Sequence, residues 1–289
     1  MSFAQDSVTA PADGGSQAAL SAVRAGLRNG SLVPYLGPGV VALAEPQFPT
    51  GYGALAEFFA ARVALPRRAV GNPWASAQFI ESRKHRATLA AMMAEAFQPV
   101  VPPLPFHRWL AQAAPPLIVD TWYDGTIQAA FAGRDDWGTI QGITRAGIGE
   151  DRWYRAYDRH GRDVPLAAAA EWRTVIYQPH GSVRPAGNFL IADSDYVEVL
   201  TEIDIQSPIP EEVRRRRGGR GFVFLGCRFH DQMLRSYARQ ILKRSGGPHY
   251  AVVDPAALAR NEGRFVAELG LFPIATPLDR ALAELTTGG

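Results

Sequence analysis

The sequence predicts a doubly wound α/β fold, in which helices cover both faces of a mostly parallel β-sheet. Two observations predict it. Short, continuous apolar runs recur along the chain, and amphipathic segments of ten or more residues separate several of them. Strands that are apolar on both sides and alternate with helices are typical of parallel sheets that are buried on both faces.

The strands are expected where the apolar runs are most compact. They are expected at residues 31–37, 117–121, 173–177, 221–225, 249–253 and 271–275. The first of them runs directly into a Gly-Pro-Gly turn at residues 37–39. The second ends in two carboxylates, a hydroxyl and two aromatic rings, Asp120 to Asp124.

Helices are expected where apolar residues recur every three or four positions. A first helix is expected from residue 16, because Ala19, Leu20, Val23 and Leu27 share one face and Asn29-Gly30 is a typical helix end. Further helices are expected at residues 50–65, 72–83, 85–97, 105–113, 230–244 and 257–270. Residues 1–15 are expected to form a disordered tail and residues 16–289 one domain, in which the weakly patterned segment 132–172 is an insertion, a small subdomain or a lid.

Composition excludes several classes of function. A net charge of +2 is too small to indicate a nucleic-acid partner, and no apolar run approaches the ~20 residues that span a bilayer. The early chain has neither a cationic start nor an apolar stretch, so no secretory signal is expected, and the single cysteine, Cys227, fits a reducing compartment. We therefore expect a cytoplasmic protein. The basic run Arg214–Arg220 is interpreted as the solvated end of a short helix, with phosphate binding as the alternative.

Polar residues and glycines follow three of the predicted strands, which is where doubly wound sheets bind ligands. Gly37 and Gly39 follow the first strand, and such glycines either let backbone N–H groups approach a phosphate or form an ordinary tight turn. Thr121 and Asp124 follow the second, and they either hold ribose hydroxyls or, for Asp124, cap the next helix. His180 follows the third, as a proton acceptor or as a surface histidine.

The order of these segments carries a resemblance to a known family. After the glycine turn, the Thr-aromatic-Asp segment and His180-Gly181 come "FLIADSDYVEVL", "GFVFLGCRFHDQML" and "HYAVVD". This order resembles the sirtuin-like family, in the branch found in bacterial NAD-hydrolysing proteins, from about residue 30 to residue 280. The resemblance implies a Rossmann-like sheet that binds NAD, without a metal, and chemistry at the bond between nicotinamide and ribose.

The resemblance also implies roles for individual residues. Asp124 falls on the aspartate of the family's Thr-x-Asn-x-Asp segment, and His180 falls on its catalytic histidine. The expected NAD contacts are Gly37, Gly39, Val40, Thr121, Trp122, Gly226, Cys227 and Arg228. The breaking of the nicotinamide–ribose bond passes through an oxocarbenium-like transition state, which needs a held ribose and a base.

The chain departs from the family pattern in three places. Trp122 stands where the family has an amide, and its indole donates a hydrogen bond but accepts none. The four zinc cysteines of the deacetylase branch are absent. Cys227-Arg228 replaces a small hydroxyl residue, and Arg228 is expected to contact a phosphate or to pair with an acid such as Asp231. In "IADSDY", we expect Asp195 to cap a helix.

Two functions follow from these observations. The first is an NAD glycohydrolase in which His180 is the base and Asp124 orients the ribose. The second is a catalytically degenerate module that binds NAD or ADP-ribose, or that serves as a protein-interaction subunit, and Trp122 favours it. For either function, the protein is expected to act as a homo-oligomer or with a protein partner. A nicotinamide dehydrogenase is poorly supported, because the full glycine fingerprint is absent.

Overall fold

The computed structural model describes residues 13–144, 152–202 and 209–287. Most of the expected tail, residues 1–12, lies outside the described residues. The central feature is a nine-stranded sheet of order β11-β10-β9-β1-β2-β6-β3-β4-β5. Every neighbouring pair from β11 to β3 is parallel, and β4 and β5 add to that edge in antiparallel fashion. The predicted α/β class is therefore confirmed.

All six predicted strands are present with small changes at their ends. They are β1 (Leu32–Leu36), β2 (Leu117–Asp120), β6 (Thr174–Gln178), β9 (Gly221–Leu225), β10 (His249–Val252) and β11 (Leu271–Ile274). The remaining strands of the sheet are β3 (Trp137–Gly142), β4 (Tyr154–Asp158) and β5 (Asp163–Val164). A separate two-stranded ribbon consists of β7 (Gly181–Ser182) and β8 (Asn188–Phe189).

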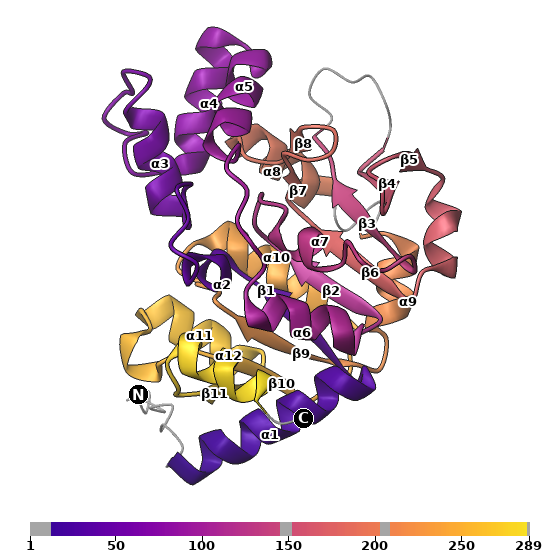
Figure 1. The fold of residues 1–289 in the computed structure, drawn as a ribbon. Helices are drawn as coiled ribbons and strands as arrows, with labels where there is room; N and C mark the ends of the chain where they lie inside the picture. Colours follow the sequence, from indigo (N-terminus) through magenta and orange to yellow (C-terminus); the bar gives the residue numbers. More distant parts are fainter. Residues whose placement is uncertain (1–12, 145–151, 203–208, 288–289) are drawn as a thin grey trace.

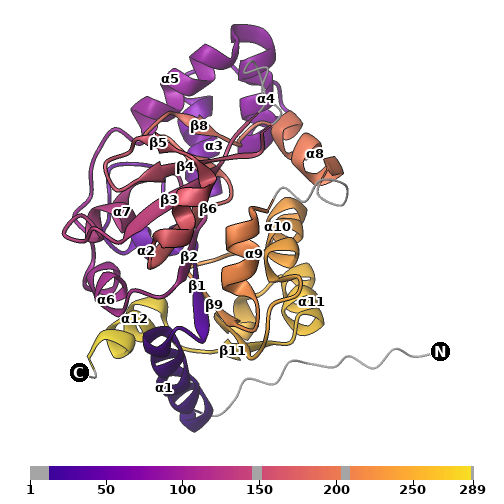
Figure 2. The same ribbon diagram turned by 90° about the vertical axis from the view of Figure 1, so that its right-hand side faces the viewer.

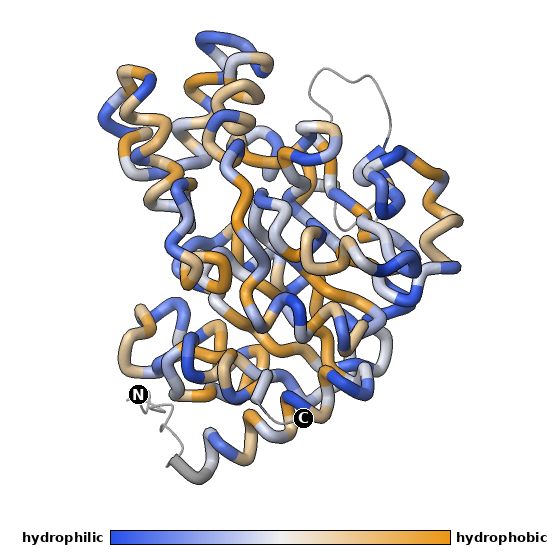
Figure 3. The backbone as a smooth tube through the Cα atoms, in the orientation of Figure 1, coloured by the Kyte–Doolittle hydropathy of each residue, from blue (hydrophilic) through white to orange (hydrophobic). Residues whose placement is uncertain are grey.

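Helices cover both faces of the sheet, because side chains of each strand alternate between the two sides. One face packs against α1 (Asp13–Asn29), α6 (Pro105–Ala113), α7 (Thr126–Ala130) and α12 (Leu278–Thr286). The other packs against η1 (Leu166–Glu171), α9 (Glu211–Arg217), α10 (Gln232–Leu242) and α11 (Arg260–Glu268). Figures 1 and 2 show these layers, and Figure 3 shows hydrophobic stretches along the central strands.

A second group of helices lies beyond one end of the sheet, at the top of Figure 1. It consists of α3 (Tyr52–Ala60), α4 (Pro73–Lys84), α5 (Arg86–Ala96) and α8 (Asp193–Glu202). These helices share a hydrophobic core of their own with the aromatic residues that follow β2, Trp122 and Tyr123. This core fixes the loop after β2, and the short α2 (Pro38–Ala42) follows β1 nearby.

The segment 132–172, expected to be an insertion or lid, contributes three strands to the main sheet. β3 pairs in parallel with β6 over five residue pairs, from Trp137↔Thr174 to Gln141↔Gln178, and β4 continues the sheet from β3. Residues 145–151 of the segment lie outside the described residues. Its described part therefore extends the sheet that carries the site.

The basic run of α9 is only partly exposed to solvent. The helix is present as predicted, with Glu211 and Glu212 in its first turn, but Arg216 and Arg217 are each only 5% exposed. Arg216 donates to the carbonyl oxygens of four residues, Pro116, Ala169, Trp172 and Arg173. The interpretation as a solvated helix end was wrong for these two arginines: Arg216 is buried against the four carbonyl oxygens named above, and Arg217 donates to the carbonyl oxygens of Gln240 and Ile241 in the last turn of α10. Among the described residues, no helix has the length and apolar character to cross a membrane.

Candidate functional site

The strand order reverses at β1, and the loops on both sides of that point surround a cavity. The chain passes from β1 to β2 on one side and later returns to place β9 on the other. The loops after β1, β2, β6 and β9 line a cavity of about 170 Å³. Seven of the predicted site residues line it: Gly37, Gly39, Thr121, His180, Gly226, Cys227 and Arg228. Three do not: Val40, Trp122 and Asp124.

The glycine turn after β1 packs against the loop after β9. The N–H of Gly37 donates to the Leu225 carbonyl (2.8 Å), and the N–H of Gly39 donates to the Gly226 carbonyl (3.0 Å). A Cβ at Gly39 would lie 2.8 Å from the Gly226 oxygen. Val40 is buried and its N–H donates to the Gly37 carbonyl (3.2 Å). These glycines therefore allow two loops to touch, and their N–H groups are already bonded.

The loop after β9 has free backbone donors. Gly226 has a φ of +65°, in the left-handed region. Among the described residues, no group accepts a hydrogen bond from the backbone N–H of Gly226, Cys227 or Arg228. Consecutive N–H groups beside a left-handed glycine are a common anion-binding arrangement. The unbonded N–H groups of this cavity thus lie on its β9 side.

The loop after β2 is held from both sides. The Thr121 hydroxyl donates to the Leu36 carbonyl (2.8 Å), which ties the loop to the end of β1. Trp122 is 1% exposed and points into the core of the helical group, where its Nε1 donates to the Pro49 carbonyl (3.0 Å). Thr50 and Tyr52, directly after Pro49, line the cavity. Trp122 therefore contributes to the site by anchoring this segment.

Two buried carboxyl groups flank this loop. Burial raises the pKa of Asp120 well above its ordinary range, the neighbouring Asp124 raises it further, and a hydrogen bond from Gln178 (3.0 Å) opposes both effects. Burial also raises the pKa of Asp124, and hydrogen bonds from Thr126 oppose it. The Asp124 Oδ1 accepts the Thr126 N–H (2.7 Å) at the start of α7, but the N-cap residue of that helix is Gly125, so Asp124 lies one residue before the capping position considered as the alternative.

His180 occupies the turn after β6, as expected, but the interpretation as a surface histidine was wrong. It is 1% exposed and packs against the rings of Tyr196 and Tyr237, with centroid separations of 5.6 and 4.7 Å. Its Nδ1 lies 3.2 Å from the Tyr196 hydroxyl, and its Nε2 has no hydrogen-bond partner among the described residues. Burial lowers the pKa of His180 to about 3, so the imidazole is neutral near pH 7.

Arg228 pairs with an acid, but the partner is Glu262 of α11 rather than Asp231. Its Nε and Nη2 lie 3.0 and 2.8 Å from the two Glu262 oxygens, while 58% of its side chain stays exposed at the cavity. Burial would raise the pKa of Glu262, but hydrogen bonds from Arg228 and from backbone N–H groups outweigh it and lower the pKa to about 2. Asp231 instead caps α10 by accepting the Met233 N–H (2.7 Å).

Cys227 and Asp195 are structural in this conformation. The Cys227 thiol is 3.5 Å from the carbonyl oxygens of Tyr35 and Leu225, and burial raises its pKa, so the neutral thiol is favoured. Asp195 accepts the N–H groups of Ile191 and Ala192 (2.9 and 3.0 Å) from the first turn of α8. Asp195 is therefore the third residue of α8 and bonds the backbone that leads into the helix, rather than standing before the helix as its N-cap.

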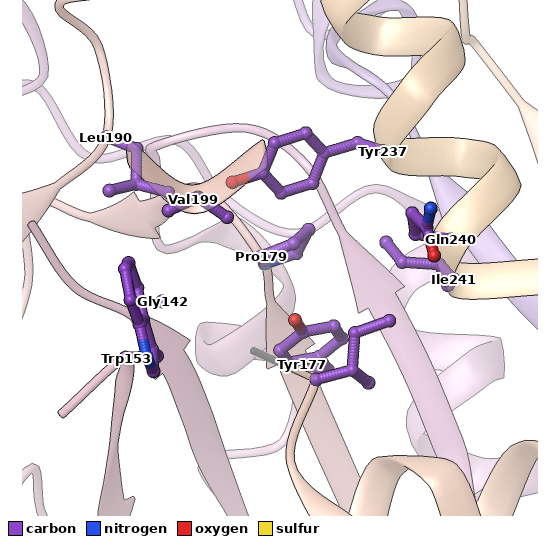
Figure 4. Close-up of a pocket in the computed structure, with 10 residues that line it drawn as sticks. Gly142, Trp153, Tyr177, Pro179, Leu190, Val199, Tyr237, Gln240 and Ile241 are labelled. Atoms are coloured by element: carbon purple, nitrogen blue, oxygen red, sulfur yellow. The ribbon is translucent and has the colours of Figure 1, made fainter. Parts of the chain in front are cut away.

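A second, much smaller cavity lies behind the turn that carries His180 (Figure 4). Tyr177 and Pro179 line it from the β6 side, and Tyr237 and Ile241 line it from α10. Its volume is about 10 Å³, close to the minimum that holds one water molecule. In Figure 4 the Tyr237 hydroxyl points toward Val199, and no partner is bonded to it among the described residues.

Sequence reasoning missed the aromatic part of the site. Tyr35, Tyr52 and Phe229 line the cavity between the loops after β1, β2, β6 and β9, and Tyr196 and Tyr237 enclose His180. Each belongs to or adjoins an amphipathic helix or a buried strand, where a core role explains it equally well. Only the glycine-rich and polar positions after strands gave a signal. Within residues 13–144, 152–202 and 209–287, no group of His, Cys, Asp and Glu side chains is arranged to hold a metal.

Comparison with known families agrees with this geometry. A family model described as the SIR2-like domain matches residues 116–274, more than half of the 289-residue chain. No curated protein matches the chain. The matched range contains the loops after β2, β6 and β9, and the glycine turn after β1 precedes it. The chain therefore belongs to the SIR2-like domain family.

Proposed function

We propose that this protein binds NAD in the cavity between the loops after β1, β2, β6 and β9 and hydrolyses the bond between nicotinamide and ribose. The observation that carries the proposal is the environment of His180. A buried imidazole nitrogen without a partner costs free energy unless a ligand satisfies it, and this Nε2 belongs to a residue on the cavity wall. A hydroxyl group of a ligand or a water molecule is the natural partner for it.

The proposed reaction needs one base and a held ribose. The bond from ribose C1′ to the nicotinamide nitrogen breaks, and its electron pair leaves with nicotinamide. A water oxygen forms the new bond to C1′, and the proton of that water passes to the Nε2 of His180 and then to solvent. The products are nicotinamide and ADP-ribose. His180 is neutral and ready to accept a proton across the neutral pH range.

The low pKa of His180 requires compensation when the imidazole takes up a proton. A buried imidazolium is stabilised by a nearby negative charge. The diphosphate of NAD supplies such a charge if it binds at the free N–H groups of Gly226, Cys227 and Arg228, on the same cavity. In this proposal the ligand raises the pKa of its own catalytic base.

The remaining predicted residues take positioning roles. Thr121 and Arg228 are proposed to contact the ribose and the phosphates, because both line the cavity. Asp124 orients the ribose indirectly, by fixing the turn between Thr121 and α7. The glycines at 37 and 39 keep the β1 loop close to the β9 loop.

The cavity accommodates part of the dinucleotide in this conformation. Its volume of about 170 Å³ is below the roughly 300–1,000 Å³ of pockets that enclose a drug-sized ligand. The segment Thr50–Tyr52 forms part of its wall, at the start of the helical group. We propose that NAD binding displaces this segment, so the Trp122 anchor at Pro49 becomes the point about which it moves.

A second function, binding of NAD or ADP-ribose without turnover, is favoured by two observations. The Asp124 carboxyl group is engaged by the N–H of Thr126, and Trp122 offers no amide to the cavity. Such a module would act as a nucleotide sensor or as a protein-interaction subunit. A homo-oligomer or a partner protein is proposed as the trigger in either case.

One experiment separates the two functions. NAD and ADP-ribose are titrated calorimetrically into the purified chain, and the same samples are analysed by chromatography for free nicotinamide. We expect binding of both ligands and release of nicotinamide. His180→Asn should keep ADP-ribose binding and lower the release rate by about 100-fold or more, whereas the control His160→Asn, at an exposed position, should change neither.

Each outcome has a definite meaning. Binding without release would favour the sensor and contradict the hydrolase for the isolated chain. No binding of either ligand would contradict both functions. Equal release by the wild type and by His180→Asn would show that the base is another group.

A further inference from the structure

The Tyr196 hydroxyl connects His180 to a buried carbonyl group. It lies 3.2 Å from the His180 Nδ1 and 3.2 Å from the Leu190 carbonyl oxygen. The Tyr123 hydroxyl donates to the same carbonyl oxygen at 2.8 Å. All of these groups are buried, so each hydrogen atom in the cluster has few acceptors to choose from.

The two neutral forms of His180 differ in the number of hydrogen bonds that the cluster makes. If Nδ1 carries the hydrogen, it donates to Tyr196, and both tyrosines donate to the Leu190 carbonyl, which has two lone pairs. If Nε2 carries the hydrogen, Tyr196 must donate to Nδ1 and gives up Leu190. That form makes one bond fewer and leaves a buried N–H donor without a partner among the described residues.

We propose that Tyr196 is a positioning residue that holds His180 in the form with hydrogen on Nδ1, so that the Nε2 lone pair is presented to the cavity. The catalytic meaning of this inference rests on the proposed hydrolase function. The tautomer itself does not, because it is a property of the free protein. A histidine base needs a free nitrogen lone pair directed at the reacting proton, and a hydrogen bond to the other ring nitrogen selects it.

Tyr196 is itself held rigidly, as this role requires. It follows Asp195, whose carboxylate accepts hydrogen bonds from the Thr144 hydroxyl (2.5 Å) and from Arg86 Nη1 (2.9 Å). Arg86 Nη2 also donates to the Phe189 carbonyl. The start of α8 is thus fixed to the start of α5 and to the end of β8, and the Tyr196 hydroxyl has little freedom to leave His180.

Two other tyrosines provide matched controls. The Tyr237 ring is closer to the imidazole than the Tyr196 ring, but its hydroxyl has no partner among the described residues. The Tyr123 hydroxyl shares the Leu190 carbonyl with Tyr196, and no bond between it and His180 is present in the structure. Each of the variants Tyr237→Phe and Tyr123→Phe therefore removes a buried tyrosine hydroxyl near His180 and leaves the partner of Nδ1 in place.

The test is nuclear magnetic resonance of the full chain labelled with ¹⁵N-histidine. Long-range ¹H–¹⁵N correlations at pH 7.5 distinguish the two neutral tautomers, and loss of one ring pattern in His180→Asn assigns His180. We expect the wild type, Tyr237→Phe and Tyr123→Phe to show hydrogen on Nδ1. Tyr196→Phe should shift His180 to a mixture or to the form with hydrogen on Nε2.

Several results would overturn the inference. A wild-type His180 with hydrogen on Nε2 would do so directly, as would a Tyr196→Phe spectrum identical to that of the wild type. If Tyr196→Phe does not fold, Tyr196→Leu, which also lacks the hydroxyl that bonds Nδ1, is measured instead under the same criteria. These spectra test the tautomer of His180 even if the protein never releases nicotinamide.

Kinetics then test the link to function in a chain that releases nicotinamide. Tyr196→Phe should lower kcat by about five- to tenfold, the effect of one lost hydrogen bond on the tautomer ratio, with the dissociation constant of ADP-ribose unchanged. Tyr123→Phe, which leaves the partner of Nδ1 in place, should change kcat by less than about twofold. A change in ADP-ribose binding with unchanged kcat would make Tyr196 a merely structural residue.

Discussion

Trp122 shows how a single replacement changes the way a site is built. Its ring lies edge-on to the rings of Tyr52 and Phe97, with centroid separations of 5.1 and 5.8 Å. Its indole N–H donates a hydrogen bond to the Pro49 carbonyl. A smaller amide at this position would leave a large void between these rings. The tryptophan is therefore part of the core that positions the cavity wall. Its presence alone does not decide whether the protein hydrolyses NAD.

Restoring an amide at position 122 should accordingly damage the protein. We expect Trp122→Asn to lower the free energy of unfolding by about 3–5 kcal/mol, because it creates a cavity and buries an amide among apolar rings. Trp122→Phe keeps most of the ring and should cost about 1–2 kcal/mol, mainly through the lost bond to Pro49. Urea denaturation measures both. A Trp122→Asn variant as stable as the wild type would show that the core tolerates the amide.

Burial of His180 predicts a pH dependence of stability. Its folded-state pKa of about 3 lies below the value of about 6.5 expected in the unfolded chain, so the unfolded state binds more protons between these values. The contribution to stability is present above about pH 6.5 and is lost as the pH falls toward 3, at up to about 1.4 kcal/mol per pH unit. The carboxyls of Asp120 and Asp124 act in the opposite direction but are common to wild type and variant.

Comparison with a histidine variant isolates this effect. The free energy of unfolding of the wild type minus that of His180→Asn should decrease steadily when the pH is lowered from 7 to 4.5 in urea denaturation experiments. His107, whose pKa burial lowers to about 4, is present in both proteins and cancels. A difference that stays constant over this range would mean that His180 is solvated and titrates normally.

At the level of elements, the sequence predicted the strands and helices whose hydrophobic pattern is clear. The parallel strands that are apolar on both faces, such as β2 and β9, were located to within a residue at most ends. β3 was missed because its sequence, WGTIQG, contains two glycines and a buried glutamine, and β4 because its sequence, YRAYD, is rich in polar groups. Their strand character comes from pairing with β6 and with each other, which a local pattern does not reveal.

The candidate site was predictable to a similar extent and for a similar reason. Positions directly after strands, such as Thr121 and His180, follow from the topology of doubly wound sheets. The partners of His180 come from α8 and α10, far along the chain, and only the folded structure brings Tyr196 and Tyr237 to the imidazole. The pairing of Arg228 with Glu262 could not be predicted from the sequence for the same reason.

The α9 helix provides a prediction at the level of an element. Arg216→Ala should lower the free energy of unfolding by about 3–5 kcal/mol, because four backbone carbonyl groups and the Glu212 carboxylate lose a buried donor. The neighbouring Arg214→Ala should change it by less than about 0.5 kcal/mol, because Arg214 is exposed. Thermal and urea denaturation of both variants test this, and equal small effects would restore the interpretation of a solvated basic run.

For the whole molecule, the cavity depends on contact between two parts of the chain that are far apart in sequence. The loop after β1 lies before the range matched by the SIR2-like model, and the loop after β9 lies within it. They meet where the strand order reverses, through hydrogen bonds from Gly37 and Gly39. The cavity therefore forms only when the N-terminal strand β1 has paired between β2 and β9.

Substitution of the glycine at this contact should affect stability and binding together. Gly226 has a φ of +65°, and a Cβ there would lie 2.5 Å from the Val40 nitrogen. Gly226→Ala should lower the free energy of unfolding by about 3 kcal/mol, of which about 1 kcal/mol is the cost of the left-handed backbone and the rest the collision between the two loops. Gly219, with a φ of +70° and no atom within 4 Å of a built Cβ, has the same backbone cost without the collision.

Gly219→Ala is therefore the matched control, and it should cost only about 1 kcal/mol. Under conditions where both variants are folded, calorimetry should find ADP-ribose binding retained in Gly219→Ala and lost or weakened at least about tenfold in Gly226→Ala, because the β9 loop and its free N–H groups must shift away from the β1 turn. Equal unfolding costs would show that the loops separate without penalty. Unchanged binding in a folded Gly226→Ala variant would place the phosphates elsewhere than on the loop after β9.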